Sequence, residues 1–285
     1  MARRSQRCGP DSPLDSAPLR LKLTIEYAGT RYSGWQIQTN ARTVQGEIDR
    51  AIREGTGATR FELYGSGRTD AGVHALAQVA HLDIDSTIPA EPLRRRINAV
   101  LPSDINILRI DTVRHKFHAR HDAVARSYIY QIARRRTAFG KALVWWVKEE
   151  LDLDAMSGAA KAFVGMHDFR TFSDDDPEEK STKVLLEAFE VHEDGDLVLV
   201  HLEGSHCLWK MVRRLVGVLV EVGRGALTPA QAAGLLVEPS PLPARVTAPA
   251  SGLFLERVYY PGDPRDQPVQ PAVVLPRFTG RPPMP

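Results

Sequence analysis

Apolar and polar residues alternate at the start of the folded part of this chain, a pattern typical of a half-buried β-strand. Leu19, Leu21, Leu23, Ile25 and Tyr27 alternate there with polar residues. A helical spacing follows in Val44, Ile48, Ala51 and Ile52, with Gly55 and Gly57 expected to stop that helix. Further patterns predict strands at 61–64, 78–85 and 105–113 and a helix at 92–101. The predicted order of elements is β-α-β-β-α-β.

The second half of the chain repeats this order. The patterns predict a strand at 127–133, a helix at 153–164, a hairpin of strands 184–191 and 197–203 around the turn 193–196, an apolar helix at 208–219 and a strand at 252–260. Thr228 followed by Pro229 begins one more helix, since these residues suit the N-cap and first helical positions. Two such units in tandem predict an α+β protein of two ferredoxin-like subdomains. We expect their sheets to join edge to edge, with a cleft between the halves.

Composition places this folded part between two loose ends. Residues 1–18 and 261–285 are rich in Pro and Arg and predict a disordered leader and a flexible tail. The two subdomains are therefore expected at 19–122 and 123–260. The chain has 285 residues, is 43% hydrophobic and carries a net charge of +2, as expected of a globular protein. No stretch suits a membrane span, and two cysteines without zinc-type spacing fit a reducing cytoplasm.

Arginines are clustered on this nearly neutral chain, at 94–96, 134–136 and 213–214. Such clusters favour a local anionic partner. The alternative is that each run is a solvated helix or strand face, and the pattern alone does not decide between the two.

A glycine-rich loop lies between two predicted strands of the first half. Three glycines fall within residues 65–72, around Arg68 and Asp70. Glycine permits backbone conformations closed to other residues, and an arginine beside an aspartate keeps the carboxylate ionised. Such a carboxylate can act as a nucleophile or general base. The alternative is an ordinary turn with a surface ion pair.

The loop from Gly65 to His74 resembles the signature of the bacterial tRNA pseudouridine synthase A family. Other segments resemble further blocks of that family, in the same order along the chain: 27–38, 43–45, 116–120, 167–169, 211–213, 248–250 and 252–253. Together these blocks span nearly all of the chain from about residue 20 to 260.

The resemblance implies the pseudouridine synthase fold and roles for individual residues. Asp70 would be the catalytic carboxylate, and Arg68 would pair with it and help to hold or replace the extruded base. Tyr128 would stack on the target base, and Arg213 would pair with Asp70 or with a phosphate. The loop from Arg31 to Arg42 would reach along the RNA. By pattern alone, a tyrosine placed like Tyr128 is more often a core residue than a stacking platform, and a basic residue placed like Arg213 is usually at the solvent-exposed edge of an amphipathic helix.

The resemblance also implies an isomerase without cofactor or metal, acting on tRNA as a homodimer. Its targets would be uridines on the 3′ side of the anticodon stem-loop, at tRNA positions 38–40. A base stacked in RNA has to be flipped out for this reaction.

Two departures from the family pattern leave alternatives open. Cys207 stands where an aromatic residue is more usual, and residues 173–179 are unusually acidic. A paralogue that modifies a different RNA is one alternative, and a non-catalytic RNA-binding protein is another. A third is a metal-dependent phosphodiesterase, since hard cations bind carboxylates; its candidate ligands are Asp174, Asp175, Asp176, Glu178 and Glu179.

Overall fold

The computed structural model describes residues 19–276, so the predicted leader and the last nine residues of the predicted tail lie outside it. The first half has the predicted order of elements. These are β1 (Leu19–Tyr27), α1 (Val44–Thr56), β2 (Phe61–Gly65), β3 (His74–Ile84), α2 (Ala90–Asn98) and β4 (Ile105–Thr112). Helix α1 continues through Gly55, and it is Gly57 that ends it in a left-handed conformation with φ of 75°.

The second half also contains all the predicted elements, with additions. The predicted elements are β5 (Ala125–Ala133), α3 (Leu153–Lys161), β8 (Lys183–Asp194), β9 (Leu197–Gly204), α4 (Met211–Gly223), α5 (Pro229–Gly234) and β10 (Leu253–Tyr259). Two short strands and one short helix were not predicted: β6 (Trp145–Trp146), β7 (Gly165–Asp168) and α6 (Leu242–Arg245). The predicted helix at 208–219 begins only at Met211, because Lys210 adopts a left-handed conformation with φ of 63°.

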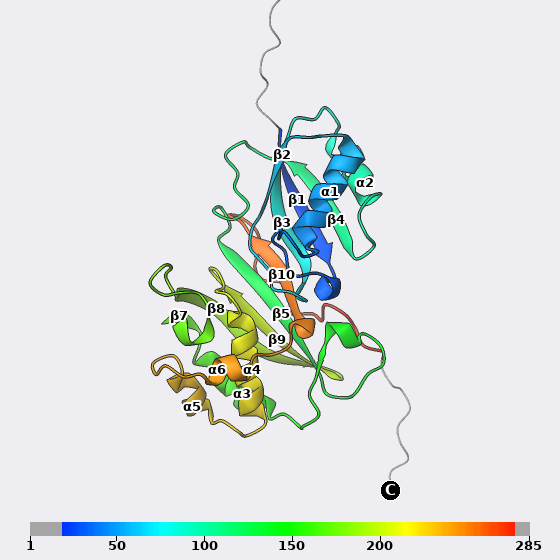
Figure 1. The fold of residues 1–285 in the computed structure, drawn as a ribbon. Coiled ribbons are helices and arrows are strands. Elements are labelled where there is room, and N and C mark those ends of the chain that lie inside the picture. Colours follow the sequence, from blue (N-terminus) through cyan, green and yellow to red (C-terminus); the bar gives the residue numbers. More distant parts are fainter. Residues whose placement is uncertain (1–18, 277–285) are drawn as a thin grey trace, which may run out of the picture.

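The ten strands within residues 19–276 form one mixed sheet. Figure 1 shows β10 beside β5 at the junction of the two halves. The main path of the sheet runs β4-β1-β3-β10-β5-β9-β8-β7, with β2 on β3 and β6 on β5. When the four predicted strands of each half are numbered in chain order, their order across the sheet is 4-1-3-2, which is the ferredoxin-like arrangement. The halves are joined where β10 pairs in parallel with β3, through Phe254 with His74 and Leu255 with Ala75. The predicted α+β class and the edge-to-edge union of two sheets are confirmed.

The hydrophobic core consists of two large clusters. One packs α1 and α2 against the first-half strands, and the other packs α3 and α4 against the second-half strands (Figure 1). Strand β10 contributes to both, with Leu253 in the second cluster and Leu255 and Val258 in the first. Tyr128 of β5 also packs against both clusters. The junction between the halves is therefore a packed interface.

Residues 261–276 follow the surface of the sheet, although composition predicts a loose tail. Leu275 is buried beside Leu197 and Leu199 of β9. The amide of Val273 donates to the Gln131 side chain at 3.0 Å, and Arg265 forms ion pairs with Glu187 and Glu203. This part of the predicted tail thus adds a layer to the second half. Within residues 19–276, no helix is both long and apolar enough to cross a membrane.

Candidate active site

The loop between β2 and β3 carries Asp70 and is anchored at its start by hydrogen bonds. The amide of Ser66 donates to the carbonyl of Val79 at 2.7 Å. The side chain of buried Gln78 accepts from the Ser66 hydroxyl at 2.7 Å and donates to the carbonyl of Gly67 at 3.1 Å. The loop then closes in a turn, in which the amide of Val73 donates to the carbonyl of Asp70 at 3.1 Å. The backbone at Asp70 is therefore fixed from both sides.

A second loop, residues 28–36, packs directly on this turn. The amide of Trp35 donates to the Thr69 carbonyl at 3.1 Å, and the carbonyl of Tyr32 accepts from the amide of Gly72 at 3.2 Å. A β-carbon at Gly34 would lie 2.5 Å from the Thr69 carbonyl oxygen. The two backbones approach so closely that only glycine fits at position 34.

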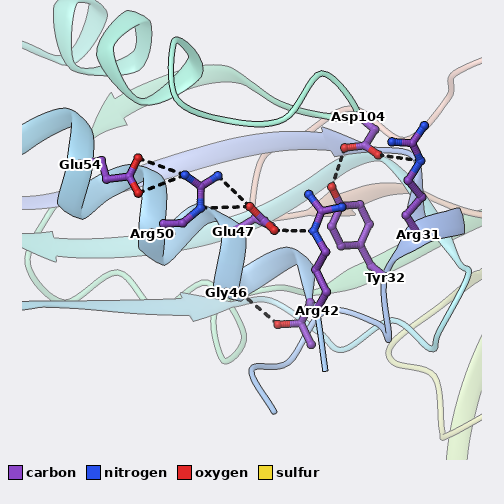
Figure 2. A network of polar contacts seen from close by, with 9 residues as sticks. Arg31, Tyr32, Arg42, Gly46, Glu47, Arg50, Glu54 and Asp104 are labelled. Atoms are coloured by element: carbon purple, nitrogen blue, oxygen red, sulfur yellow. Dashed lines mark hydrogen bonds and ion pairs between the residues drawn. The ribbon is translucent and has the colours of Figure 1, made fainter. Parts of the chain in front are cut away.

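A polar network holds this second loop in turn (Figure 2). The hydroxyl of Tyr32 donates to Asp104 at 2.5 Å, and the Arg42 guanidinium lies 5.0 Å from the Tyr32 ring centre. Burial, together with the hydrogen bond to Asp104, raises the pKa of Tyr32. Arg42 also bonds Glu47 at 2.5 Å, whereas Arg31 reaches Asp104 only at 3.9 Å and is largely exposed. Loop 28–36 is thus braced against both α1 and the segment before β4.

The carboxylate of Asp70 faces an arginine from the opposite half. Arg213 Nη1 lies 3.3 Å from Asp70 Oδ2, and both side chains are about one-fifth exposed, at 18% and 22%. Arg213 Nε donates to the Ala248 carbonyl at 2.7 Å, while the Ala248 amide donates to the Arg213 carbonyl at 3.0 Å. The Ala248 carbonyl thus holds one edge of the Arg213 guanidinium, and the other edge faces Asp70.

Arg68 does not pair with Asp70, and the expectation that it would is wrong. Its side chain is exposed and has no hydrogen-bond or ion-pair partner among residues 19–276. Thr69 between them is buried, with its hydroxyl 2.8 Å from that of Tyr27. The loop therefore directs Asp70 toward Arg213 and leaves the cation of Arg68 in solvent, free to bind a ligand.

Tyr128 lies at the junction between the halves, partly exposed and with its hydroxyl enclosed by protein. Burial raises the pKa of Tyr128 well above its usual value. Burial likewise raises the pKa of the Cys207 thiol to about 12. Cys207 and Tyr128 both pack against the second-half core cluster, and Tyr128 also packs against the first-half cluster, which contains Tyr27. Tyr128 therefore lies against the cores of both halves.

Sequence patterns gave no indication of the role of Arg126. Its buried guanidinium donates to three carbonyl oxygens at 3.0 Å each, those of Ser66, Arg120 and Ser205. One side chain of the second half thus holds the start of the Asp70 loop. The only signal in the sequence is an arginine just before the predicted strand 127–133, which does not reveal long-range partners.

The acidic segment 173–179 is partly neutralised by cations at the start of α4. Asp174 forms ion pairs with Lys210, at 2.7 Å, and with Arg214. Asp175 accepts from the Trp209 amide at 2.9 Å and from Lys180 at 3.2 Å. Two of the five proposed metal ligands are therefore bonded to cations, and no group of metal-binding residues was found in the part of the chain that the structure describes.

Comparison with known proteins identifies one family. A family model described as tRNA pseudouridine synthase matches residues 23–122 and 159–261. The tRNA pseudouridine synthase A 2 of Clostridium tetani is 38% identical over 84% of this chain and 98% of its own length. The tRNA pseudouridine synthase A of Nitrobacter winogradskyi is 42% identical over 85% of this chain and 96% of its own. Among solved structures, an archaeal box H/ACA sRNP Nop10–Cbf5 complex aligns at 11% identity over 70% of this chain and 44% of that one, with a TM-score of 0.33.

Proposed function

Because this chain belongs to the tRNA pseudouridine synthase family, a family of isomerases that act on tRNA, we propose that Asp70 is the carboxylate that carries its reaction. The reaction breaks the N1–C1′ bond of uridine, rotates the base and forms a C5–C1′ bond. N1 gains a hydrogen and C5 loses one, so the change is redox-neutral. An ionised carboxylate can attack C1′, attack C6, or stabilise a glycal-like intermediate after the base leaves.

The observation that supports this proposal best is the ion pair between Asp70 and Arg213. The two residues are 143 positions apart and belong to different halves of the sheet, and each is held by its own backbone contacts. An ordinary surface turn would not need both halves of the protein to fix one aspartate.

We propose supporting roles for three more residues. Arg213 aligns Asp70 from the opposite half. Arg68, exposed and unpaired within residues 19–276, binds a phosphate or fills the gap that the flipped base leaves. Tyr128 offers one face of its ring to the target uracil while its hydroxyl is held near Cys207.

The proposed substrate is the anticodon stem-loop of tRNA, with uridines on its 3′ side as targets. This choice rests on the resemblance described above. The exposed Arg31 suits an RNA that passes over loop 28–36 on its way to Asp70, because its cation faces solvent. A paralogue that modifies a different RNA is the alternative, and the position of the product distinguishes the two.

The test is to incubate the protein with unmodified tRNA and to map pseudouridine chemically along the product. Wild type should convert anticodon-stem uridines, whereas Asp70→Asn should bind the tRNA with similar affinity and make no product. Asp85→Asn is the matched control, since Asp85 is an exposed aspartate just beyond β3. Full conversion by Asp70→Asn would refute the assignment, and product at other positions would refute the substrate.

We further propose that the protein works in the cytoplasm as a homodimer whose two subunits grip one tRNA, and that 19–122 and 123–260 are its subdomains. The dimer rests on the resemblance, and the subdomains on the two core clusters. Light scattering that gives the mass of a single chain at working concentration would refute the dimer.

A further inference from the structure

A large aromatic side chain is exposed beside the proposed active site and has no role in the function described so far. Trp209 precedes α4, and 53% of it is exposed. By contrast, Trp35 is fully buried in the first-half core.

The neighbours of Trp209 along the chain place it at the edge of the site. Two positions before it is Cys207, which packs with Tyr128 against the second-half core cluster. Four positions after it, Arg213 forms the ion pair with Asp70. Trp209 itself lies just before α4, which begins at Met211 after the left-handed Lys210. Along the chain, Trp209 therefore lies between Cys207 and the helix that carries Arg213.

The backbone of Trp209 is held on both sides by the acidic segment. Its amide donates to the Asp175 carboxylate at 2.9 Å, and its carbonyl accepts from the Asp174 amide at 3.4 Å. The next residue, Lys210, is the only non-glycine residue with positive φ within residues 19–276, and its ammonium bonds Asp174 at 2.7 Å. A left-handed conformation is unfavourable for a non-glycine residue, so the Asp174 contact helps to maintain this turn. The result is an exposed indole on a rigid support.

Charge around Trp209 favours a nucleobase over a phosphate as its ligand. Lys210 lies 4.9 Å from the indole ring centre but is already paired with Asp174. Asp176, Glu178 and Glu179, which follow Asp175 in the chain, are exposed and form no ion pair within the described part of the chain. These acids repel a phosphate, whereas the face of a base is uncharged and stacks well on an aromatic ring.

We propose that Trp209 is a stacking platform for a nucleobase of the RNA substrate other than the target uridine. Extruding the target uridine unstacks its neighbours. A neighbouring base that turns outward at the edge of the site then stacks on the exposed indole of Trp209. Asp174 and Asp175 hold the backbone of Trp209, so the acidic segment 173–179 positions this platform. The inference rests on the proposed function, because it takes RNA as the ligand.

The test compares Trp209→Ala and Trp209→Phe with the matched control Trp146→Ala. Trp146 is also an exposed tryptophan, 43% accessible, on β6 at the far end of β5. With unmodified tRNA, the KM of Trp209→Ala should rise roughly 5- to 150-fold, the range that loss of one stacked base covers. Its kcat at saturation should stay within about twofold, because this contact does not change during the reaction. Trp209→Phe should retain most of the affinity, and Trp146→Ala should match wild type.

A second readout reports stacking itself. Tryptophan emission of wild type should be quenched when tRNA binds, and Trp209→Phe should lose that quenching while Trp146→Phe keeps it. An unchanged KM in Trp209→Ala, or undiminished quenching in Trp209→Phe, would overturn the inference. In either case wild type still makes pseudouridine, whereas failure of the proposed function would appear as a wild type without product.

Discussion

Replacing Gly34 by alanine tests whether loop 28–36 sets the position of Asp70. The new β-carbon would lie 2.5 Å from the Thr69 carbonyl oxygen and 3.2 Å from the carbonyl carbon of Asp70, whereas ordinary contact begins near 3.4 Å. One of the two backbones must therefore move by about 0.9 Å. A misplacement of about 1 Å at a catalytic group lowers the rate by about 100-fold. We expect Gly34→Ala to lower kcat by about 30- to 100-fold.

The same substitution also destabilises the fold, and a control separates the two effects. Gly34 has φ of 92°, which costs an alanine about 1 kcal/mol or more. Gly57 has φ of 75° but nothing within 4 Å of its ideal β-carbon. Gly57→Ala should therefore lose about 1 kcal/mol of unfolding free energy with kcat within about twofold of wild type.

The assay is release of tritium from tRNA labelled at C5 of uridine, because that hydrogen leaves when the C5–C1′ bond forms. Filter binding of the same tRNA shows whether the loss lies in binding or in kcat. The reasoning is refuted if folded Gly34→Ala keeps its kcat, or if Gly57→Ala loses as much.

Two further predictions concern buried polar groups. Arg126→Met removes a guanidinium from three carbonyls and should lower the unfolding free energy by about 2–4 kcal/mol, measured by urea denaturation. The loss of kcat should be larger than the loss of tRNA affinity. A loss of unfolding free energy below about 0.5 kcal/mol would contradict the role of this side chain. Burial, with the charge of Arg20, lowers the pKa of His81 to about 4. The unfolded chain therefore binds a proton at this histidine more tightly than the folded chain does. The free energy of unfolding is highest above pH 6.5 and decreases as the pH falls toward 4; at pH 5 the loss is about 2 kcal/mol. His81→Gln keeps an acceptor for the Ala119 amide, which His81 binds at 3.1 Å, and should lose less stability between pH 7 and pH 5; equal losses in both proteins would show that His81 is not responsible.

Elements such as β1 and α1 could be predicted because each buries one face. Leu21, Leu23 and Ile25 alternate along β1 and are almost fully buried, as a period of two requires. Strand β7 could not be predicted this way, because its four residues are strand only through pairing with β8. The start of α4 was misjudged for a related reason. The apolar spacing continues back to Leu208, but Lys210 leaves the helical region in a turn held by Asp174.

The site was predictable only in part. Glycines around Asp70 indicated an unusual loop, and the turn with its positive φ at Gly72 agrees with that. The resemblance implied both Arg68 and Arg213 as partners of Asp70, and in the structure only Arg213, from the other half, forms an ion pair with it. Arg126 and the Asp174 contacts were missed, because both depend on residues 30 or more positions away that only the folded sheet brings together.

Strand β10, the last strand within residues 19–276, lies in the middle of the sheet, between β3 and β5, and this has a consequence for synthesis of the protein. Until residues 253–259 have left the ribosome, both neighbouring strands have an open edge, and open edges invite pairing with other chains. The two halves also cannot come together, so Asp70 and Arg213 stay apart. A chain truncated before Leu253 should therefore be inactive and prone to aggregate, and an incomplete copy of the enzyme would not act on tRNA.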